Sequence, residues 1–578
     1  MTRLVTRMTW LSGCCVVLAI FSLLLPAVAA GQAGAVSVGG VMGTHGEANA
    51  ISGIDRRRPP ATARLYFRPT VTVYEKLTLN FDFMLSTEND AFRSSARQSL
   101  NQYAIHPKWG WGDAHIGDFA DSYSPLTFNG VRVRGAGFNV WRGPFRFSSF
   151  GGRSQRAVPG GATTGRFERN IFGGRIGIGN PGNASLDVIF LRAEDNAASL
   201  ALPEDTIPFI DHLPDTTFVE DTLSIGVVAN PYAVTPHENV VVGLTGTLNL
   251  FKDVLSLRGE LTGSGHTRDT RSDEIESEDV LSEIPGVVRS VITPRVSTTA
   301  DYAYTLEATA RLDPLTTKIS VRNIGPGYMS MGVASVMSDQ RSAQLNTSLR
   351  LRRWNIKFDG TRQRDNLIGQ KTFTTNRTRV GTAVAFRASR SWNTSLRVNY
   401  ASLGNGAAGE QQWIAYSTWL VGSSQTFTLS RRGLFRSASL GYTYRVSGDE
   451  NPLRIQSESE SHTINARLLA GVSGNINLTP SLGIVRSRFG GVGWTTRQTY
   501  SLAAQLRLAR GKWATSLQLG RAQVNQTNSL QATLTSRFQL NRSETVTLVA
   551  RASDHDNMLE VGQDFSEFLV TLRWAHRF

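Results

Sequence analysis

The sequence predicts an all-β protein: a single large antiparallel transmembrane β-barrel of about 26 strands that follows a cleaved signal peptide. Three observations lead to this fold class. Segments of roughly ten to fifteen residues alternate between apolar and polar positions, the segments are long enough for a tilted bilayer crossing of about nine to eleven residues, and the links between them alternate between short and long. Losing one hairpin, near position 113, would give roughly 24 strands.

The first thirty residues have the three regions of a secretory signal peptide. Arg3 and Arg7 precede an apolar run, and small residues follow up to Ala30. We therefore expect a signal peptide over 1–30 and one barrel domain over 31–578. A lipoprotein-like box ends at Cys14, but its apolar run follows it instead of preceding it, so we expect no lipid on that residue.

Composition excludes several classes of protein and site. The two cysteines, Cys14 and Cys15, both lie in the expected signal, so the mature chain would have no disulfide and no thiolate site. No later stretch contains about eighteen consecutive apolar residues, so no membrane-spanning helix is expected. Removing Arg3 and Arg7 from the 61 basic residues leaves 59, which exceed the 46 acidic ones by 13.

The strand pattern is clear in several places. From Leu77 to Leu85, and again from Val240 to Leu250, large apolar residues occupy every second position and small polar residues lie between them. Leu534 and Thr535 are neighbours in a third such segment, where the pattern places leucine toward lipid and threonine toward the interior.

The links supply an independent check on the strand count. Short turns occur at 74–76, 142–144, 179–182, 251–253, 313–314 and 473–475, and longer polar links fall between them, as in outer-membrane barrels. Because short and long links must alternate, we interpret 195–238 as one long loop that carries a local strand. We interpret 411–431 as one long strand instead of a hairpin. Counting from Ala35 to Met42 as the first crossing gives an even number of strands with both termini at the short-turn end.

The last eleven residues, FLVTLRWAHRF, alternate in the same way and end on an aromatic carboxyl terminus. This ending resembles the closing strand of bacterial outer-membrane β-barrel proteins, and the strand pattern extends the resemblance along the chain. The resemblance implies location in the outer membrane and an assembly signal that the barrel assembly machinery reads, formed by Phe568, Val570, Leu572, Trp574 and Phe578. His576 departs from the pattern, because an apolar or aromatic residue is more usual there.

If the apolar positions face lipid, then a set of arginines faces the lumen. On the strands that carry them, the only inward acids expected are Asp359 and Glu567. An arginine-rich lumen would favour anions, whereas guanidinium groups near strand ends could instead reach phosphate at the membrane surface. The set is Arg350, Arg352, Arg377, Arg379, Arg387, Arg397, Arg467, Arg507, Arg537, Arg551, Arg573 and Arg577.

Two glycine-rich clusters and one acidic run stand out from the strand pattern. The first cluster runs from Gly117 through Ser124-Pro125-Leu126-Thr127 to Gly135, and the second spans Ile324 to Tyr328. Both suggest bulges or close backbone approach at the barrel rim or in a loop folded inside. The acidic run of 269–283 is read as a solvated outer loop or as a site for a divalent cation or a partner.

Motifs for catalysis are weak. The GxGxxG match at 177–182 contains Pro181 and precedes a strand, which makes it a hairpin turn, and no metal-ligand spacing of histidines is present. Asp554-His555-Asp556 is read as part of an outer loop. We therefore expect no enzyme, no cofactor and no metal.

The sequence leads to an expected function of passive channel or export conduit with an arginine-rich, anion-favouring lumen. A surface-display, adhesive or structural barrel with an occluded lumen stays open as an alternative, as does, more distantly, an outer-membrane hydrolase or protease. Expected partners are outer-membrane lipid and lipopolysaccharide, the assembly machinery and small anionic solutes, with no nucleic acid.

Overall fold

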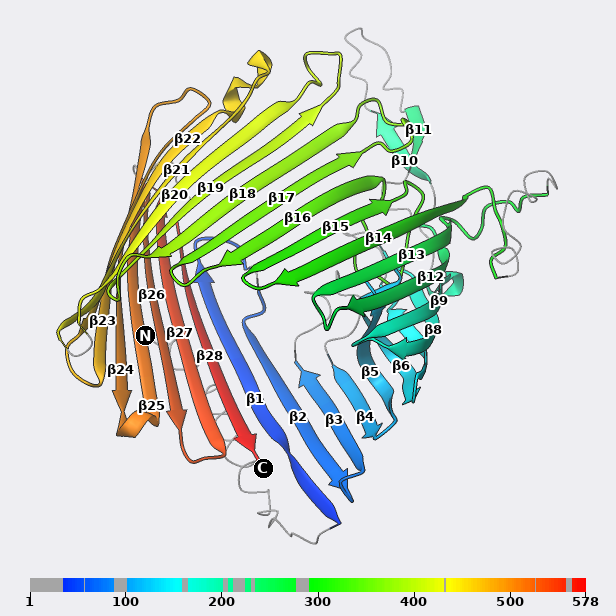
Figure 1. Ribbon diagram of the computed structural model, residues 1–578, viewed down its shortest axis with the longest axis horizontal. Helices are drawn as coiled ribbons and strands as arrows, with labels where there is room; N and C mark the ends of the chain where they lie inside the picture. The colour runs from blue at the N-terminus through cyan, green and yellow to red at the C-terminus, as the bar shows by residue number, and fades with distance from the viewer. Residues whose placement is uncertain are drawn as a thin grey trace.

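The computed structural model describes residues 35–56, 58–87, 101–158, 165–200, 206–211, 224–229, 234–276, 291–430, 433–524, 527–557 and 564–578. Within these residues the chain forms one closed antiparallel barrel of 26 strands. The colour order in Figure 1 runs around the wall, so that the last strand lies beside the first. The expected signal peptide lies outside the described residues.

The first part of the wall contains nine strands. They are β1 (Val36–Ser52), β2 (Ala61–Val73), β3 (Leu77–Ser86), β4 (Gln102–Trp109), β5 (Gly112–Ser124), β6 (Phe128–Arg142), β7 (Phe145–Gln155), β8 (Glu168–Asn180) and β9 (Ala184–Asn196). A short 3-10 turn, η2 (Ala197–Ser199), follows β9.

The second part of the wall begins after a long link. Its strands are β12 (Glu238–Leu250), β13 (Leu255–Thr267), β14 (Thr298–Leu312), β15 (Leu315–Ile324), β16 (Gln340–Arg350), β17 (Trp354–Asp365), β18 (Thr375–Arg387), β19 (Trp392–Asn405), β20 (Ala415–Thr428), β21 (Phe435–Asp449), β22 (Ser459–Gly471), β23 (Ile476–Phe489), β24 (Thr495–Leu508), β25 (Trp513–Val524), β26 (Thr527–Gln539), β27 (Glu544–Asn557) and β28 (Phe565–Arg577). Short 3-10 turns η3 (Pro452–Ser457) and η4 (Ala509–Gly511) lie in two of the links.

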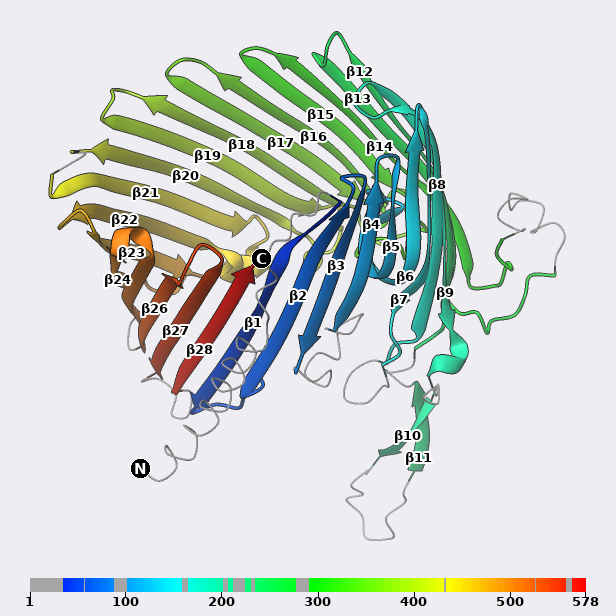
Figure 2. The ribbon, with the colours of Figure 1, turned by 90° about the horizontal axis from the view of Figure 1, so that it is seen from below.

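The strand count and both difficult assignments are confirmed. The segment 195–238 is a link that carries a separate two-stranded hairpin, β10 (Thr206–Asp211) and β11 (Ser224–Ala229), which lies beyond the end of β9 in Figure 2. The segment 411–431 contributes the single strand β20. The crossing near position 113 is β5.

The wall closes where β1 pairs with β28 over twelve residue pairs, from Val41–Arg577 to Ser52–Ser566. Closure leaves no open sheet edge, which is the condition for a β-structure to cross a bilayer. No described helix has the length and hydropathy of a membrane span.

The outer face carries the apolar residues of the alternation. Leu244, Leu306, Leu396 and Leu440 are each more than 40% exposed, and the residues between them on each strand face the interior. At the short-turn end, tryptophans on β17 and β19 stack on phenylalanines of the next strand, with Trp354 and Phe386 centroids 4.1 Å apart, and Trp513 of β25 meets Phe538 edge to face. Such a band of apolar residues edged by aromatic residues is the lipid-facing surface of a transmembrane barrel.

The structure decides one open alternative and corrects one interpretation. Both glycine-rich clusters belong to chain that is folded inside the barrel, which was one of the two places expected for them. Asp554-His555-Asp556 lies within β27 and not in an outer loop. Tyr66 lies over Gly43 on the inner face, and its hydroxyl donates to the carbonyl oxygen of Trp574 at 3.4 Å.

Candidate functional site

The inner face of the barrel has two contrasting parts. The filled side is the inner face of β5–β9 and β12–β15, where infolded chain covers the wall and leaves a cluster of buried apolar residues. The open side is the inner face of β16–β28, where few side chains are buried. Residues that pair directly across neighbouring strands lie on the same face of the sheet. Ala303 of β14 is buried on the inner face, so its partner on β15, and then the partners on each following strand, identify the inner positions around the wall.

On the filled side, the β5–β6 hairpin folds back into the barrel. The rings of His115 and Phe119 stack with centroids 5.2 Å apart, whereas residues four apart in a straight strand are separated by about 13 Å. Gly117, between them, has a φ of 96°, which favours glycine. A side chain there would also collide with the carbonyl oxygen of Tyr103. The bend at Gly117 therefore turns the rest of the hairpin toward the lumen.

Aromatic rings hold the folded hairpin against the wall. Phe128 stacks on Phe150 of β7 with centroids 4.3 Å apart, and Tyr123 packs edge-on against both rings. The guanidinium of Arg175 lies 4.9 Å from the centre of the Tyr123 ring. These contacts bury the hairpin tip, where Leu126 and Phe128 have no exposed surface.

The β15–β16 link locks the tip in place. Tyr328 is 1% exposed, and its hydroxyl donates to the carbonyl oxygen of Leu126 at 2.9 Å while accepting from the hydroxyl of Thr262 at 3.0 Å. The backbone N–H of Leu126 donates to Glu260 of β13 at 3.1 Å. Every polar group at this contact is satisfied by a partner on another element, and burial raises the pKa of Tyr328.

Further hydrogen bonds extend the lock along both segments. The hydroxyl of Ser330 donates to the carbonyl oxygen of Thr127 at 2.7 Å, and the backbone N–H of Met331 donates to the Asn239 side chain at 3.0 Å. The two glycine-rich clusters of the sequence, some two hundred residues apart, thus form one structure inside the barrel.

The end of the same link is tied to the β17–β18 loop by an ion pair. Lys371 lies 2.6 Å from Asp339, whose carboxylate also accepts backbone N–H groups of Asn366 and Leu367. This hydrogen bond raises the pKa of Lys371. Burial tends to raise the pKa of Asp339, but the bond from Lys371, the backbone N–H groups of Asn366 and Leu367 and the charge of Lys371 together outweigh burial and lower the pKa overall.

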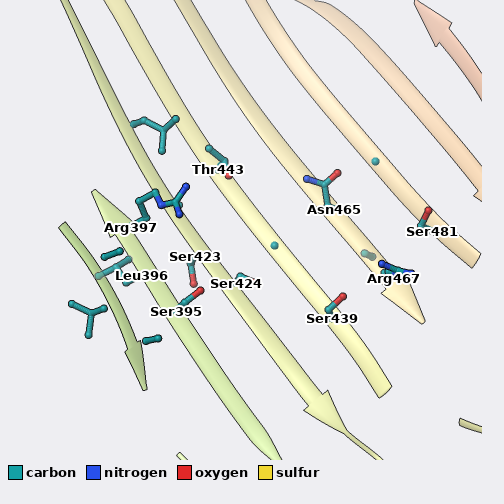
Figure 3. Close-up of a pocket in the computed structure, with 18 of the residues that line it drawn as sticks. Ser395, Leu396, Arg397, Ser423, Ser424, Ser439, Thr443, Asn465, Arg467 and Ser481 are labelled. Atoms are coloured by element: carbon teal, nitrogen blue, oxygen red, sulfur yellow. The ribbon is translucent and has the colours of Figure 1, made fainter. Parts of the chain in front are cut away.

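The open side includes a groove with a volume of about 910 Å³. Small hydroxyl and amide side chains line it together with apolar residues such as Leu420 and Val485 and three cationic side chains, Lys357, Arg397 and Arg467. Figure 3 shows both guanidinium groups on the same surface as Ser395, Ser424 and Asn465. Unlike the filled side, this surface carries no covering segment among the described residues.

The register places most of the expected arginines at inner positions of the open side. Arg377 and Arg379 lie near the loop end of β18, and Arg507 and Arg537 lie near the short-turn end of β24 and β26. Arg350 is the last residue of β16, whereas Arg352 lies in the turn after it and belongs to no strand. The rest are inner residues of their strands: Arg387, Arg551, Arg573 and Arg577.

The two sides differ in how their charges are partnered. On the filled side and the strands just before it, acids meet the cations: Arg68 binds Asp82 at 2.8 Å and Arg146 binds Asp187 at 2.9 Å. Similar pairs are Arg169–Asp195 and Lys318–Glu307. Within the described part of the chain, none of Arg377, Arg379, Arg397, Arg467, Arg507 and Arg537 forms an ion pair.

Acids on the open side are few and mostly engaged. The carboxylate of Glu567 accepts from Asn49, and Asp449 accepts backbone N–H groups at the loop end of β21. Asp365, at the loop end of β17, binds the N–H of Thr375 at 2.6 Å. Asp359 is the remaining inner acid, next to Gly381. The fixed charge of this wall is therefore positive.

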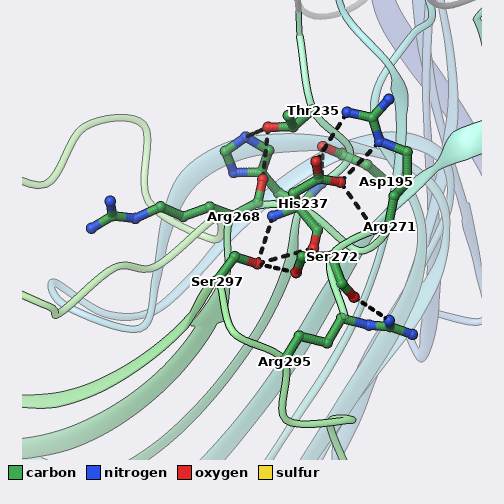
Figure 4. A network of polar contacts seen from close by, with 9 residues as sticks. Asp195, Thr235, His237, Arg268, Arg271, Ser272, Arg295 and Ser297 are labelled. Atoms are coloured by element: carbon green, nitrogen blue, oxygen red, sulfur yellow. Dashed lines mark hydrogen bonds and ion pairs between the residues drawn. The ribbon is translucent and has the colours of Figure 1, made fainter. Parts of the chain in front are cut away.

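At the loop end, the acidic run begins in a hydrogen-bonded network. Asp269 is held by Arg271 at 3.0 Å, and Glu274 by Arg295 at 3.1 Å. Figure 4 shows Arg271, Ser272 and Arg295 of this network near His237, whose backbone N–H donates to Asp195. Burial lowers the pKa of His237. These two acids are thus partnered by arginine, and residues 277–283 of the run lie outside the described residues.

The C-terminal strand presents its expected signal residues to the exterior. Phe568 is 50% exposed, and its pairing sets Val570, Leu572 and Trp574 on the same face. Phe578 stacks on Phe67 of β2 with centroids 6.1 Å apart, and its backbone exchanges hydrogen bonds with Gly40.

No group of three metal-ligating side chains occurs among the described residues.

Comparisons with known proteins match the barrel but give no relative. No protein-family model and no curated protein matches the sequence. Among solved structures, a pilus assembly intermediate of Escherichia coli (PapC-PapD-PapK-PapG) is 11% identical, with 93% of this chain and 60% of that chain covered and a TM-score of 0.42. The siderophore receptor PirA from Pseudomonas aeruginosa is 9% identical, with 94% and 80% covered and a TM-score of 0.38.

A third match is OpdK from Pseudomonas aeruginosa, determined with vanillate, at 10% identity, with 60% of this chain and 94% of that chain covered and a TM-score of 0.30. Scores of this size carry no argument about function. The class rests on the barrel itself: closure, an apolar exterior and aromatic residues at its edge make the chain an integral outer-membrane β-barrel protein.

Proposed function

We propose that this outer-membrane barrel is a passive channel or export conduit whose lumen favours anions. The observation that supports the proposal is the set of arginines on the open side that have no acidic partner in the part of the chain that the structure describes. Their charge is not cancelled within the wall, whereas Arg68 and Arg146 lose theirs to neighbouring carboxylates. A solute in the groove would meet guanidinium groups and small hydroxyl groups.

Uncompensated fixed charge on a pore wall raises the local concentration of counter-ions and lowers that of co-ions. Screening limits each charge to about 10 Å at 0.1 M salt and about 3 Å at 1 M. In a wide barrel the effect therefore depends on how close the solute passes to the open side. Small anions and extended anionic chains that follow the groove would feel it most.

One observation favours a different function, a display or structural barrel with an occluded lumen. The β5–β6 hairpin and the β15–β16 link occupy the interior along the filled side, where buried apolar residues and hydrogen bonds such as those of Tyr328 and Ser330 hold them. If the long links at the loop end also enter the lumen, the barrel would present loops without conducting.

Ion conduction through a planar bilayer separates the two functions. With purified protein and a tenfold KCl gradient from 0.1 to 0.01 M, the channel is expected to conduct and its reversal potential to have the sign of chloride selectivity. Raising both sides to about 1 M salt should weaken the selectivity because the arginines become screened. Absence of conductance would favour the occluded barrel, and cation selectivity would contradict the role of the arginines.

A further inference from the structure

We propose that Arg341, Arg362 and Arg364 form a binding site on the exterior of the barrel for the phosphate groups of lipopolysaccharide in the adjacent leaflet. We call these three residues the outer triad. The site is separate from the lumen and does not rest on channel activity.

The outer triad faces lipid. Arg341 is on the same side of β16 as Leu345, which is exposed and pairs with exposed Ile319 of β15. Arg362 and Arg364 have the same parity on β17 as exposed Trp354. All three arginines are exposed, and their side of the wall is the apolar exterior.

The height of the triad matches a membrane interface. Trp354 stacks on Phe386 at the short-turn end of β17, where aromatic residues mark one edge of the apolar band. Arg362 and Arg364 lie eight and ten residues further along the same strand, which is about 26 to 33 Å. With a strand tilt of about 40°, the rise along the membrane normal is roughly 20 to 25 Å, close to the height of the band. The triad therefore lies at the opposite interface, on the loop side.

The charges of the triad lie close together. Arg341 pairs directly with Arg364 across β16 and β17, so two like charges face each other at a Cβ distance of about 5 Å, which is destabilising without an anion. Arg362 is two residues along the same face, within about 7 Å. The Asn323 side chain accepts from Arg341 at 3.0 Å and fixes its direction.

No acid of the described chain neutralises this surface. The residues that pair with Arg362 and Arg364 on β18 are Thr378 and Asn376, both uncharged. The nearby acids, Asp339 and Asp365, are both bound by Lys371. The triad therefore presents three positive charges to the interface with no acidic partner in the described residues.

A second outward pair of arginines shows what a satisfied site looks like. Arg486 and Arg488 on β23 lie over the Trp494 ring, at 4.8 and 5.3 Å from its centre, and Arg488 also pairs with Glu460 at 2.8 Å. The Trp494 ring and the Glu460 carboxylate therefore compensate part of the charge of these two arginines. Among the described residues the outer triad has neither an aromatic ring of this kind nor an acid, which leaves its charges open to an anion from outside the chain.

Phosphate is the anion that fits this place. Guanidinium groups bind phosphate through two parallel hydrogen bonds, and a site at the loop-side interface is within reach of lipid headgroups. Each arginine near an anionic leaflet contributes about a fivefold gain in binding. Three close arginines match a headgroup that carries more than one phosphate better than they match a single inorganic phosphate ion.

The test compares lipid retention by purified detergent-solubilised protein using native mass spectrometry. The probes are bisphosphorylated lipid A, its monophosphorylated form and inorganic phosphate. The variant is R341Q/R362Q/R364Q, and the matched control is R377Q/R379Q, which removes inward-facing arginines near the same height on β18. Heat-modifiable gel migration reports whether each variant is folded.

The wild type is expected to retain bisphosphorylated lipid A in preference to the monophosphorylated form, with little retention of inorganic phosphate. The triple variant should lose at least about tenfold of this affinity, whereas the control should keep it. Equal retention by the wild type and the folded triple variant would overturn the proposal. Preferential binding of inorganic phosphate would show an anion site that does not recognise lipid. An unchanged reversal potential in the triple variant would show that this site is independent of the channel.

Discussion

The filled and open sides of this barrel are built from the same kind of strand, yet their inner faces differ in chemistry. On the filled side the inner residues include Phe150, Ile189 and Leu191, and all three are almost fully buried. On the open side the corresponding positions are Ser395, Thr443 and similar small polar residues that line a groove. An apolar inner face indicates that another segment covers it, and a small polar one indicates contact with water.

Charge follows the same division. Where the wall is covered, a buried cation without a partner would be costly, and Arg146 meets Asp187 while Arg169 meets Asp195. Where the wall is wet, a guanidinium group needs no protein partner, and arginines such as Arg397 stand alone. The comparison shows that the arginines without an acidic partner lie on the open side, where water and solutes can reach them.

The largest expected effect concerns the contact of Tyr328 with the tip of the β5–β6 hairpin on the filled side. Tyr328→Ala removes a buried ring and two hydrogen bonds, which should cost about 3 to 5 kcal/mol. Freed from its anchor, the hairpin tip should move and the single-channel current should become larger and noisier. Denaturant unfolding and bilayer recordings check the two readouts. The control is Tyr500→Ala on the lipid-facing side, which leaves the lumen unchanged; an equal change in current there would refute the lock.

The orientation of the open wall is tested by two neighbouring residues. Leu534→Arg places a charge toward lipid and should cost about 2 to 4 kcal/mol, whereas Thr535→Arg places it toward water and should cost little. Folded yield and unfolding in lipid vesicles measure the difference. Equal effects of the two substitutions would show that the assigned faces are wrong.

A smaller effect on stability is expected when the same substitution, threonine to valine, is made on each of the two sides. Thr262→Val removes the hydroxyl that donates to Tyr328, which should destabilise the filled side by about 1 to 2 kcal/mol. Thr443→Val on the open side removes a hydroxyl that borders the groove and should change stability by less than about 0.5 kcal/mol. If Thr443→Val were the costlier change, the groove would not be as wet as the comparison requires.

The smallest effect on stability is expected at the seam between the two ends of the wall. Deleting Phe578 removes its ring contact with Phe67 and its two backbone hydrogen bonds with Gly40, but the twelve residue pairs of the β1–β28 ladder remain. The folded barrel should therefore unfold at nearly the same denaturant concentration, while the amount assembled in the membrane falls. Heat-modifiable migration of the membrane fraction measures assembly, and full assembly without Phe578 would show that the terminal aromatic residue is not part of the signal.

Much of the wall follows from the sequence because its physics is local. Alternation along Leu77–Leu85 and the short turn around Phe251-Lys252-Asp253 depend on neighbouring residues, and both appear as predicted. The glycine-rich clusters indicated either the barrel rim or a loop folded inside, but the contact between Leu126 and Tyr328 joins residues far apart in the sequence, so no local pattern reveals it. A second signal was present: Val188–Leu191 is apolar on both faces, which is typical of a strand covered on both sides.

The central claim is that the unpaired arginines of the open side set the selectivity of the pore. The most direct test replaces Arg377, Arg397, Arg467 and Arg537 with Gln and measures the reversal potential in a KCl gradient at low salt. The control is the neutral double change R146Q/D187N on the filled side, which removes an ion pair without changing net charge. We predict that the fourfold variant shifts the reversal potential toward zero while the control keeps the chloride-selective value of the wild type. A fourfold variant with wild-type selectivity would contradict the account.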